Sequence, residues 1–74
     1  MQRQEAQSLL ETFIRDELDR FLFQPMTEKI KDEIKLAALK AYEKFYNTLT
    51  LVEREELGIL PPQIVNPDNL ISIG

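Results

Sequence analysis

The sequence has no histidine and no cysteine, and these two absences exclude most of the side-chain chemistry on which enzymes depend. Ser-His and Cys-His catalytic pairs and the ordinary zinc sites all need one of these residues, and a helical di-iron site needs Glu-x-x-His pairs. Glycine is scarce too, because Gly58 and Gly74 are the only two, so the chain has no glycine-rich phosphate-binding loop. We therefore expect a protein that is not an enzyme and has no cofactor, no metal and no small-molecule substrate.

The lack of cysteine also limits how the fold is stabilised, because no disulfide can support a thin core. A chain of 74 residues forms one domain at most, and a single core of that size is only marginally sufficient. Hydrophobic residues make up 43% of the chain and charged residues 30%, which is typical of a globular domain. Tight helix packing, self-association or docking on a partner must supply the remaining stability.

Positive charge and long apolar runs are scarce as well. The formal net charge of −4 argues against a nucleic-acid partner, because such binding depends on cationic contacts. No run approaches the roughly 18 apolar residues that span a bilayer, so we expect no membrane partner. Residues 1–5 are polar and do not resemble a secretion signal, and we expect a cytoplasmic location in the producing cell.

An amphipathic pattern over residues 4–23 predicts a first helix, which ends before Pro25 because proline disfavours helical geometry at the preceding residue. Thr27 is the best N-cap for a second helix over residues 28–47, with Glu28 in its first turn. The connection between the two is short, so we predict an antiparallel helical hairpin.

Local signals define a short third helix and a different C-terminal region. Thr50 and Glu53 fit a capping box for a helix over residues 51–57, which ends at Gly58. Beyond it, residues 63–65 read as a very short strand, residues 66–69 as a turn and residues 70–73 as a second strand. The predicted fold is mainly α, with residues 1–60 as the helical unit and residues 61–74 as an extended docking tail.

Both long helices carry an apolar arc wider than the stripe of roughly 100° that one neighbouring helix covers. Either the third helix and the tail cover the excess, or a partner or second copy does, or both do so together. For the tail we predict a strand that touches another polypeptide, because its backbone groups suit the edge of another sheet. The candidate partner-binding residues are Leu9, Phe13, Glu17, Leu39, Tyr42, Tyr46, Leu70, Ile71 and Ile73.

Glu17 is the polar member of this set and projects near the middle of the first apolar arc. A carboxylate in that position needs a partner or solvent, or its pKa rises. It is expected to pair at the interface edge with a lysine such as Lys31 or Lys35, or to serve as a partner-binding charge.

A resemblance to a known family rests on two short segments. Phe-Leu-Phe-Gln-Pro at residues 21–25, followed by a second helix, resembles the small domain of contractile-tail sheath and baseplate-wedge proteins of phages. Residues 65–73 resemble the strand entry near the C-terminus of those proteins, so the resemblance covers residues 9–73. Gln24 stands where the family has an acidic residue. The resemblance implies a virion component that assembles in many copies.

The leading functional interpretation is a structural or adaptor subunit that binds other protein chains, as a homo-oligomer or in a larger complex. The alternative is a small acidic regulator or inhibitor that occupies a basic surface on its target. Salt dependence distinguishes the two, because a charge-driven contact weakens steeply with salt and an apolar contact does not.

Overall fold

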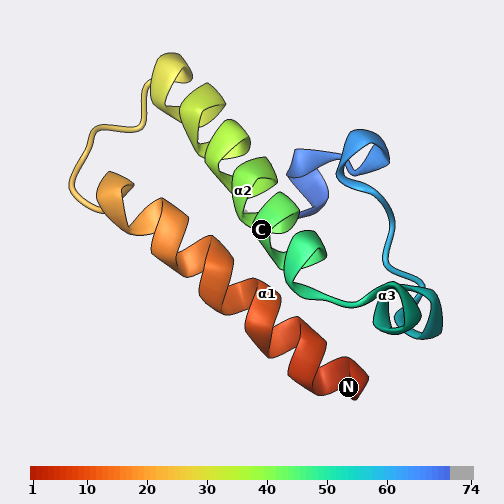
Figure 1. The fold of residues 1–74 in the computed structure, drawn as a ribbon. Coiled ribbons are helices and arrows are strands. Elements are labelled where there is room, and N and C mark those ends of the chain that lie inside the picture. Colours follow the sequence, from red (N-terminus) through yellow and green to blue (C-terminus); the bar gives the residue numbers. More distant parts are fainter. Residues whose placement is uncertain (71–74) are drawn as a thin grey trace.

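The computed structural model describes residues 1–70 and consists of three α-helices joined by short turns (Figure 1). The helices are α1 (Arg3–Leu18), α2 (Glu28–Thr48) and α3 (Leu51–Leu57). Single 3₁₀ turns follow α1 at Asp19–Phe21 and occupy Pro62–Ile64 and Pro67–Asn69 in the tail. Residues 1–70 include no β-strand, so the mainly α prediction is confirmed for the part of the chain that is described.

The two long helices form the predicted antiparallel hairpin (Figure 1). The α-helical part of α1 ends at Leu18, earlier than the predicted residue 23, and tightens into the 3₁₀ turn before Pro25. Thr27 is the N-cap of α2, as predicted, and its hydroxyl oxygen accepts a hydrogen bond of 3.2 Å from the backbone N–H of Ile30. This bond satisfies one of the free donors at the helix start and fixes where α2 begins.

The core is built on α2, which packs against α1 on one side and the tail on the other (Figure 1). Small side chains at Ala38 and Ala41 are completely buried, and they let neighbouring backbone approach α2 closely. Phe45 is the largest fully buried side chain, with 1% of its surface exposed. The buried residues form one cluster of Ala6, Tyr42, Phe45 and Leu49, and a smaller one of Phe21, Ile34 and Ala37 nearer the hairpin connection.

The short helix α3 has the bounds and caps that the sequence predicts. The backbone N–H of Glu53 donates to the Thr50 hydroxyl at 3.1 Å, and the Glu53 carboxylate accepts from the Thr50 N–H at 2.9 Å. Gly58 ends the helix with φ of 66°, a left-handed conformation that glycine adopts without a steric penalty. None of the seven residues of α3 is buried, so these local hydrogen bonds, rather than packing, stabilise the helix.

The tail returns along α2, and the strand expected at residues 63–65 is wrong. Pro62–Ile64 is a 3₁₀ turn in which the Ile64 N–H donates to the Pro61 carbonyl at 3.1 Å. The turn predicted at residues 66–69 is present, and the Asn66 side chain accepts from the Asp68 N–H at 3.0 Å. Leu70 follows this turn with a right-handed α backbone conformation (φ −85°, ψ −26°) rather than an extended one. The rest of the strand predicted over residues 70–73, including Ile71 and Ile73, lies outside the described residues.

Side-chain contacts hold the described tail to α2. The Tyr42 hydroxyl donates a hydrogen bond of 2.5 Å to the Leu60 carbonyl, and Lys35 Nζ lies 3.4 Å from a carboxylate oxygen of Asp68. Val65 and Leu70 pack against the main buried cluster. The described tail therefore covers part of the apolar arc of α2 from within the chain, while Leu39 and Tyr46 stay half-buried.

Candidate functional site

The sequence-predicted partner-binding residues do not form one surface. Leu9 and Phe13 are half-buried on α1 and pack against the main cluster, as Leu70 does from the tail. Tyr42 is only 6% exposed, so its ring is a core element and cannot provide a surface for a partner. Leu39 and Tyr46 are half-buried on α2 and line a groove beside the tail.

Glu17 pairs with a different lysine from those expected. Its carboxylate accepts from Lys44 Nζ at 2.5 Å, and 14% of the Glu17 side chain is exposed. Lys31 instead pairs with Glu28 at the start of α2, at 3.6 Å, while Lys35 reaches Asp68 in the tail. The reason is the register of the hairpin, which sets the end of α1 beside the middle of α2 rather than beside its start.

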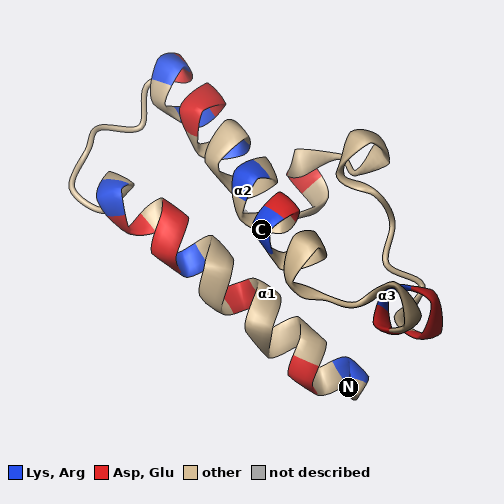
Figure 2. Cartoon of the chain, in the orientation of Figure 1, with Lys and Arg blue, Asp and Glu red and all other residues tan. Residues whose placement is uncertain are grey.

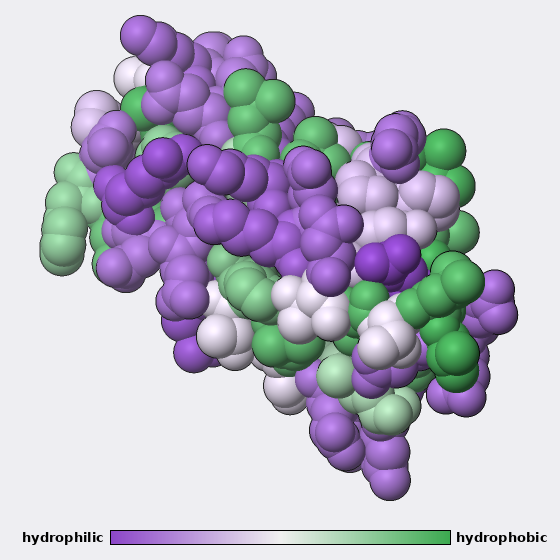
Figure 3. All heavy atoms as spheres, viewed as in Figure 1, coloured by the Kyte–Doolittle hydropathy of each residue, from purple (hydrophilic) through white to green (hydrophobic). Residues whose placement is uncertain are grey.

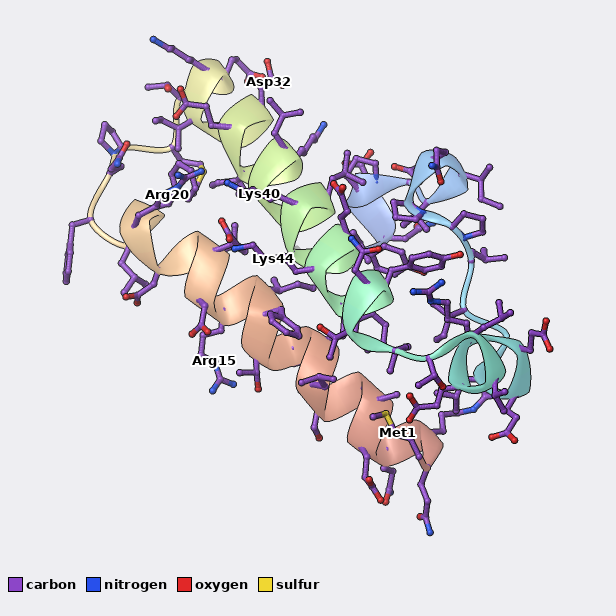
Figure 4. The ribbon with its side chains drawn as sticks, viewed as in Figure 1. Met1, Arg15, Arg20, Asp32, Lys40 and Lys44 are labelled. Carbon is purple, nitrogen blue, oxygen red and sulfur yellow. The ribbon has the colours of Figure 1, made fainter. Side chains whose placement is uncertain are left out.

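The surroundings of Glu17 favour its charged form. The hydrogen bond from Lys44 lowers the pKa of this carboxyl, and the nearby charges of Lys44, Lys40 and Arg20 act in the same direction, while partial burial opposes them. Figure 4 shows Lys40 and Lys44 on α2 and Arg20 in the 3₁₀ turn after α1, all near the space between the two helices. The arrangement is an inter-helix ion pair that fastens the hairpin, and we assign it no catalytic role.

The connection between α1 and α2 carries the most exposed large apolar side chain of the described residues, Phe23, together with two further exposed apolar side chains. Phe23 is 98% exposed, Leu22 is 67% exposed and Met26 is 59% exposed. We call these three residues the hairpin tip. In the space-filling view, apolar atoms appear at the left-hand edge of the molecule over this connection, beyond a hydrophilic band across the middle (Figure 3).

Backbone hydrogen bonds give the hairpin tip a defined conformation. The Leu22 N–H donates to the Asp19 carbonyl and the Gln24 N–H to the Phe21 carbonyl, both at 3.2 Å. The Gln24 side-chain amide also donates to the Arg20 carbonyl at 3.2 Å. Phe21 turns inward and is buried, and Phe23 therefore extends into solvent from a turn that is already folded.

A groove runs between α2 and the returning tail. It has a volume of about 580 Å³ and is lined by Leu36, Leu39, Lys40, Glu43, Tyr46, Asn47, Pro61, Pro62 and Gln63. The guanidinium of Arg54 stacks 4.0 Å from the centre of the Tyr46 ring, and its Nε donates to the Tyr46 carbonyl at 2.9 Å. Because charged and amide side chains share the lining with the apolar ones, the groove is open and mixed in character.

A smaller and more apolar pocket opens at the other end of the hairpin, between the start of α1 and the end of α3. Its volume is about 190 Å³, and we call it the α1–α3 pocket. Six of its lining residues are apolar or aromatic, namely Ala6, Leu10, Tyr42, Phe45, Leu57 and Ile59. Arg3 and Gln7 are the other two, and both are exposed, so the polar groups lie at its rim.

The outward face of α3 combines exposed apolar and acidic residues. Leu51 and Val52 are exposed in its first turn, and Glu55 and Glu56 are exposed one turn later. Figure 2 shows acidic residues concentrated on this short helix. Residues four apart lie on the same side of a helix, so the two aliphatic and the two acidic side chains form one continuous strip.

Comparisons with protein-family models, with curated proteins and with solved structures give no match to this chain. No helix within residues 1–70 is both long enough and apolar enough to cross a membrane. The functional reading therefore rests on the molecule's own surfaces. Among these, the hairpin tip was not predicted from the sequence, because the first helix was expected to continue to residue 23 and instead ends at Leu18.

Proposed function

We propose that this chain is a non-enzymatic protein-binding module, a structural or adaptor subunit of a larger assembly that uses the hairpin tip as its main contact. The observation that carries the proposal is the 98% exposure of Phe23. Burying a phenylalanine side chain is worth about 1.5–3 kcal/mol, so a phenyl ring left in water has much to gain from a partner. Large aromatic side chains are also common anchors of protein interfaces.

The folded turn beneath Phe23 supports the same proposal. A contact made by an unfolded loop loses conformational freedom when it binds, which costs affinity. In the hairpin tip, hydrogen bonds to the carbonyls of Asp19, Arg20 and Phe21 already restrict the backbone on either side of Phe23. The ring is thus presented in advance, and Leu22 and Met26 extend the apolar surface around it.

Site-specific photo-cross-linking in the producing cell tests the proposal. A photoreactive phenylalanine analogue at position 23 should give a discrete adduct with a protein, and the same analogue at the exposed position 11 on α1 should not. The adduct at position 23 should disappear when the flanking tip residues Leu22 and Met26 are both changed to serine, because these side chains are part of the proposed contact. Absence of any adduct at position 23, or equal labelling from position 11, would remove the basis of the proposal.

A phage virion or tail part, as the resemblance of residues 21–25 and 65–73 implies, is one assembly of this kind and stays a prediction. The predicted contact of the tail with a second polypeptide also stays a prediction. Co-purification with virion proteins, lost on changing Phe23 to alanine, would support the first. Recovery of the chain free of any virion protein would count against it.

One observation favours the alternative of an acidic regulator, namely the strip of Leu51, Val52, Glu55 and Glu56 on α3. Such a face suits a basic target, and its affinity would fall steeply with added salt. Changing Glu55 and Glu56 to glutamine should then abolish binding while Phe23→Ala leaves it intact. The reverse outcome is expected if the hairpin tip is the main contact.

A further inference from the structure

Sulfur that peroxides can oxidise is rare in this chain. Cysteine and methionine are the side chains that peroxides convert through a defined series of products, and the sequence has no cysteine and two methionines, Met1 and Met26. Met1 precedes α1, and Figure 4 shows it at the end of the hairpin opposite the connection. Met26 belongs to the hairpin tip, so one of the two sulfur atoms lies on the proposed contact surface.

The backbone on both sides of Met26 is constrained. The Thr27 N–H donates to the Pro25 carbonyl at 2.9 Å, which closes a three-residue γ-turn with Met26 at its centre. The ring of Pro25 restricts its own φ, and Thr27 is held in place as the N-cap of α2. Met26 therefore stays at the surface, where 59% of it is accessible to an oxidant in solution.

Met26 is also separate from the core. It belongs to neither cluster of buried residues, and it is not among the partly buried side chains that pack against them. A sulfoxide in a core disrupts packing, because it replaces an apolar side chain by a polar one. At Met26 the same change leaves the core as it is, and its effect is confined to whatever the hairpin tip contacts.

We propose that oxidation of Met26 to methionine sulfoxide by hydrogen peroxide switches off the contact made by the hairpin tip. The inference rests on the proposed protein-binding function and adds its regulation. In the reaction the thioether sulfur attacks one peroxide oxygen, an S–O bond forms as the O–O bond breaks, and the second oxygen leaves as water with both protons. The sulfur loses two electrons and the peroxide gains them.

The added oxygen changes the character of the hairpin tip beside Phe23. The unmodified thioether is a flexible apolar group that adapts well to a protein surface. The sulfoxide oxygen is a hydrogen-bond acceptor, and burying a polar group without a partner is unfavourable. The contact should therefore weaken roughly tenfold or more. Methionine sulfoxide reductases return the sulfoxide to the thioether with electrons from thiols, so the change is reversible.

Cross-linking from position 23 before and after oxidation tests the inference. The chain with the photoreactive phenylalanine analogue at position 23 is treated with hydrogen peroxide until peptide mass spectrometry shows one added oxygen at Met26. The peroxide is then removed, so that no partner is oxidised when the chain is added to an extract of the producing cell. The yield of the position-23 adduct should fall roughly tenfold or more. It should return after treatment with the two reductases, one for each sulfoxide epimer, and a thiol.

Met26→Leu is the matched control. Leucine is apolar and close to methionine in volume, so the contact should be kept, and it has no sulfur to oxidise. This variant retains Met1, so it also reports any effect of oxidation there. Its adduct should form in the usual yield and should not change after peroxide. Circular dichroism and urea denaturation should give the same folded signal and midpoint for the natural chain before and after oxidation.

Three results would overturn the inference: an equal adduct yield from the oxidised and the untreated chain, a loss of adduct from Met26→Leu on peroxide treatment, or unfolding of the chain when Met26 is oxidised. In each case an adduct from the untreated chain leaves the proposed function standing. If the untreated chain gives no adduct, the proposed function fails and the inference fails with it.

Discussion

The two long helices have similar amphipathic patterns but very different burial. Helix α2 buries Ile34, Ala37, Ala38, Ala41, Tyr42 and Phe45, whereas α1 buries Ala6 alone. The cause is position, because α2 lies between α1 and the returning tail and α1 has α2 as its main neighbour (Figure 1). An apolar arc therefore shows how much cover a helix needs and does not show which segment provides it.

The comparison also shows where apolar side chains remain exposed or half-buried. The tail covers part of the apolar arc of α2. Val65 and Leu70 pack against the main buried cluster, and the Tyr42 hydroxyl donates a hydrogen bond to the Leu60 carbonyl. On α1 the residues at one margin of the arc, Leu9 and Phe13, stay half-buried. The fold thus concentrates its buried side chains on α2, and its most exposed large apolar side chain, Phe23, lies at the hairpin tip.

The largest expected effect comes from removing the ring at the centre of α2. Phe45→Ala should lower the free energy of unfolding by about 3–5 kcal/mol, a large share of the roughly 4–11 kcal/mol expected for a domain of this size. Phe13→Ala on α1 should cost roughly half as much, because Phe13 is only half-buried. Urea denaturation followed by circular dichroism measures both. Equal losses would show that the two helices contribute alike to the core.

The next test adds volume where α2 is most tightly packed. Ala38 has no exposed surface, so Ala38→Leu should cost about 1–3 kcal/mol through overpacking. Leu36→Ala, two residues earlier and exposed, should change the free energy of unfolding by less than about 0.5 kcal/mol. An Ala38→Leu protein as stable as the natural one would mean that α2 has room against its neighbours.

A smaller effect is expected from loosening the tail alone. Tyr42→Phe removes the hydrogen bond to the Leu60 carbonyl and should cost about 1 kcal/mol. Hydrogen exchange and proteolysis should increase within residues 60–70 more than within α1. An equal increase in hydrogen exchange and proteolysis along the whole chain would instead show that the tail and the hairpin unfold as one unit.

The smallest effect concerns the ion pair between the helices. The folded-state pKa of Glu17 is lowered, so its contribution to stability is present above the ordinary value of 4.5 and is lost as the pH falls below it. Glu17→Gln should cost about 0.5–1 kcal/mol at pH 7 and should weaken the loss of stability in acid. Thermal unfolding between pH 3 and pH 7 measures this, with Asp16→Asn as the exposed control. Some acid dependence should remain, because the hydrogen bonds with Thr50 also lower the pKa of Glu53.

The parts of the fold that were predictable from the sequence are those set by local chemistry. Thr27 caps α2, Thr50 and Glu53 form the capping box, and Gly58 ends α3, and each of these features involves residues only a few positions apart. Such bonds form whenever the local backbone does, so neighbouring residues suffice to predict them. The hairpin was predictable as well, because the expected connection of residues 24–27 is too short to place the two helices far apart.

What the sequence did not reveal depends on how distant segments meet. The choice of Lys44 over Lys31 or Lys35 as the partner of Glu17 follows from the register of the hairpin. The tail runs as two 3₁₀ turns because α2 offers it a surface, although its composition is compatible with strands. Phe23 is exposed in the connection that follows the 3₁₀ turn, whose last residue, Phe21, takes the buried position.

The positions of the two tyrosine side chains give the protein an intrinsic fluorescence probe. Tyr42 and Tyr46 are its only tyrosines, and it has no tryptophan. One is hydrogen-bonded to the Leu60 carbonyl and the other lies under the Arg54 guanidinium beside Pro61 and Pro62. Ultraviolet emission from the unlabelled protein therefore comes from the junction between α2 and the tail, and changes in it report the release or the occupation of that junction in real time.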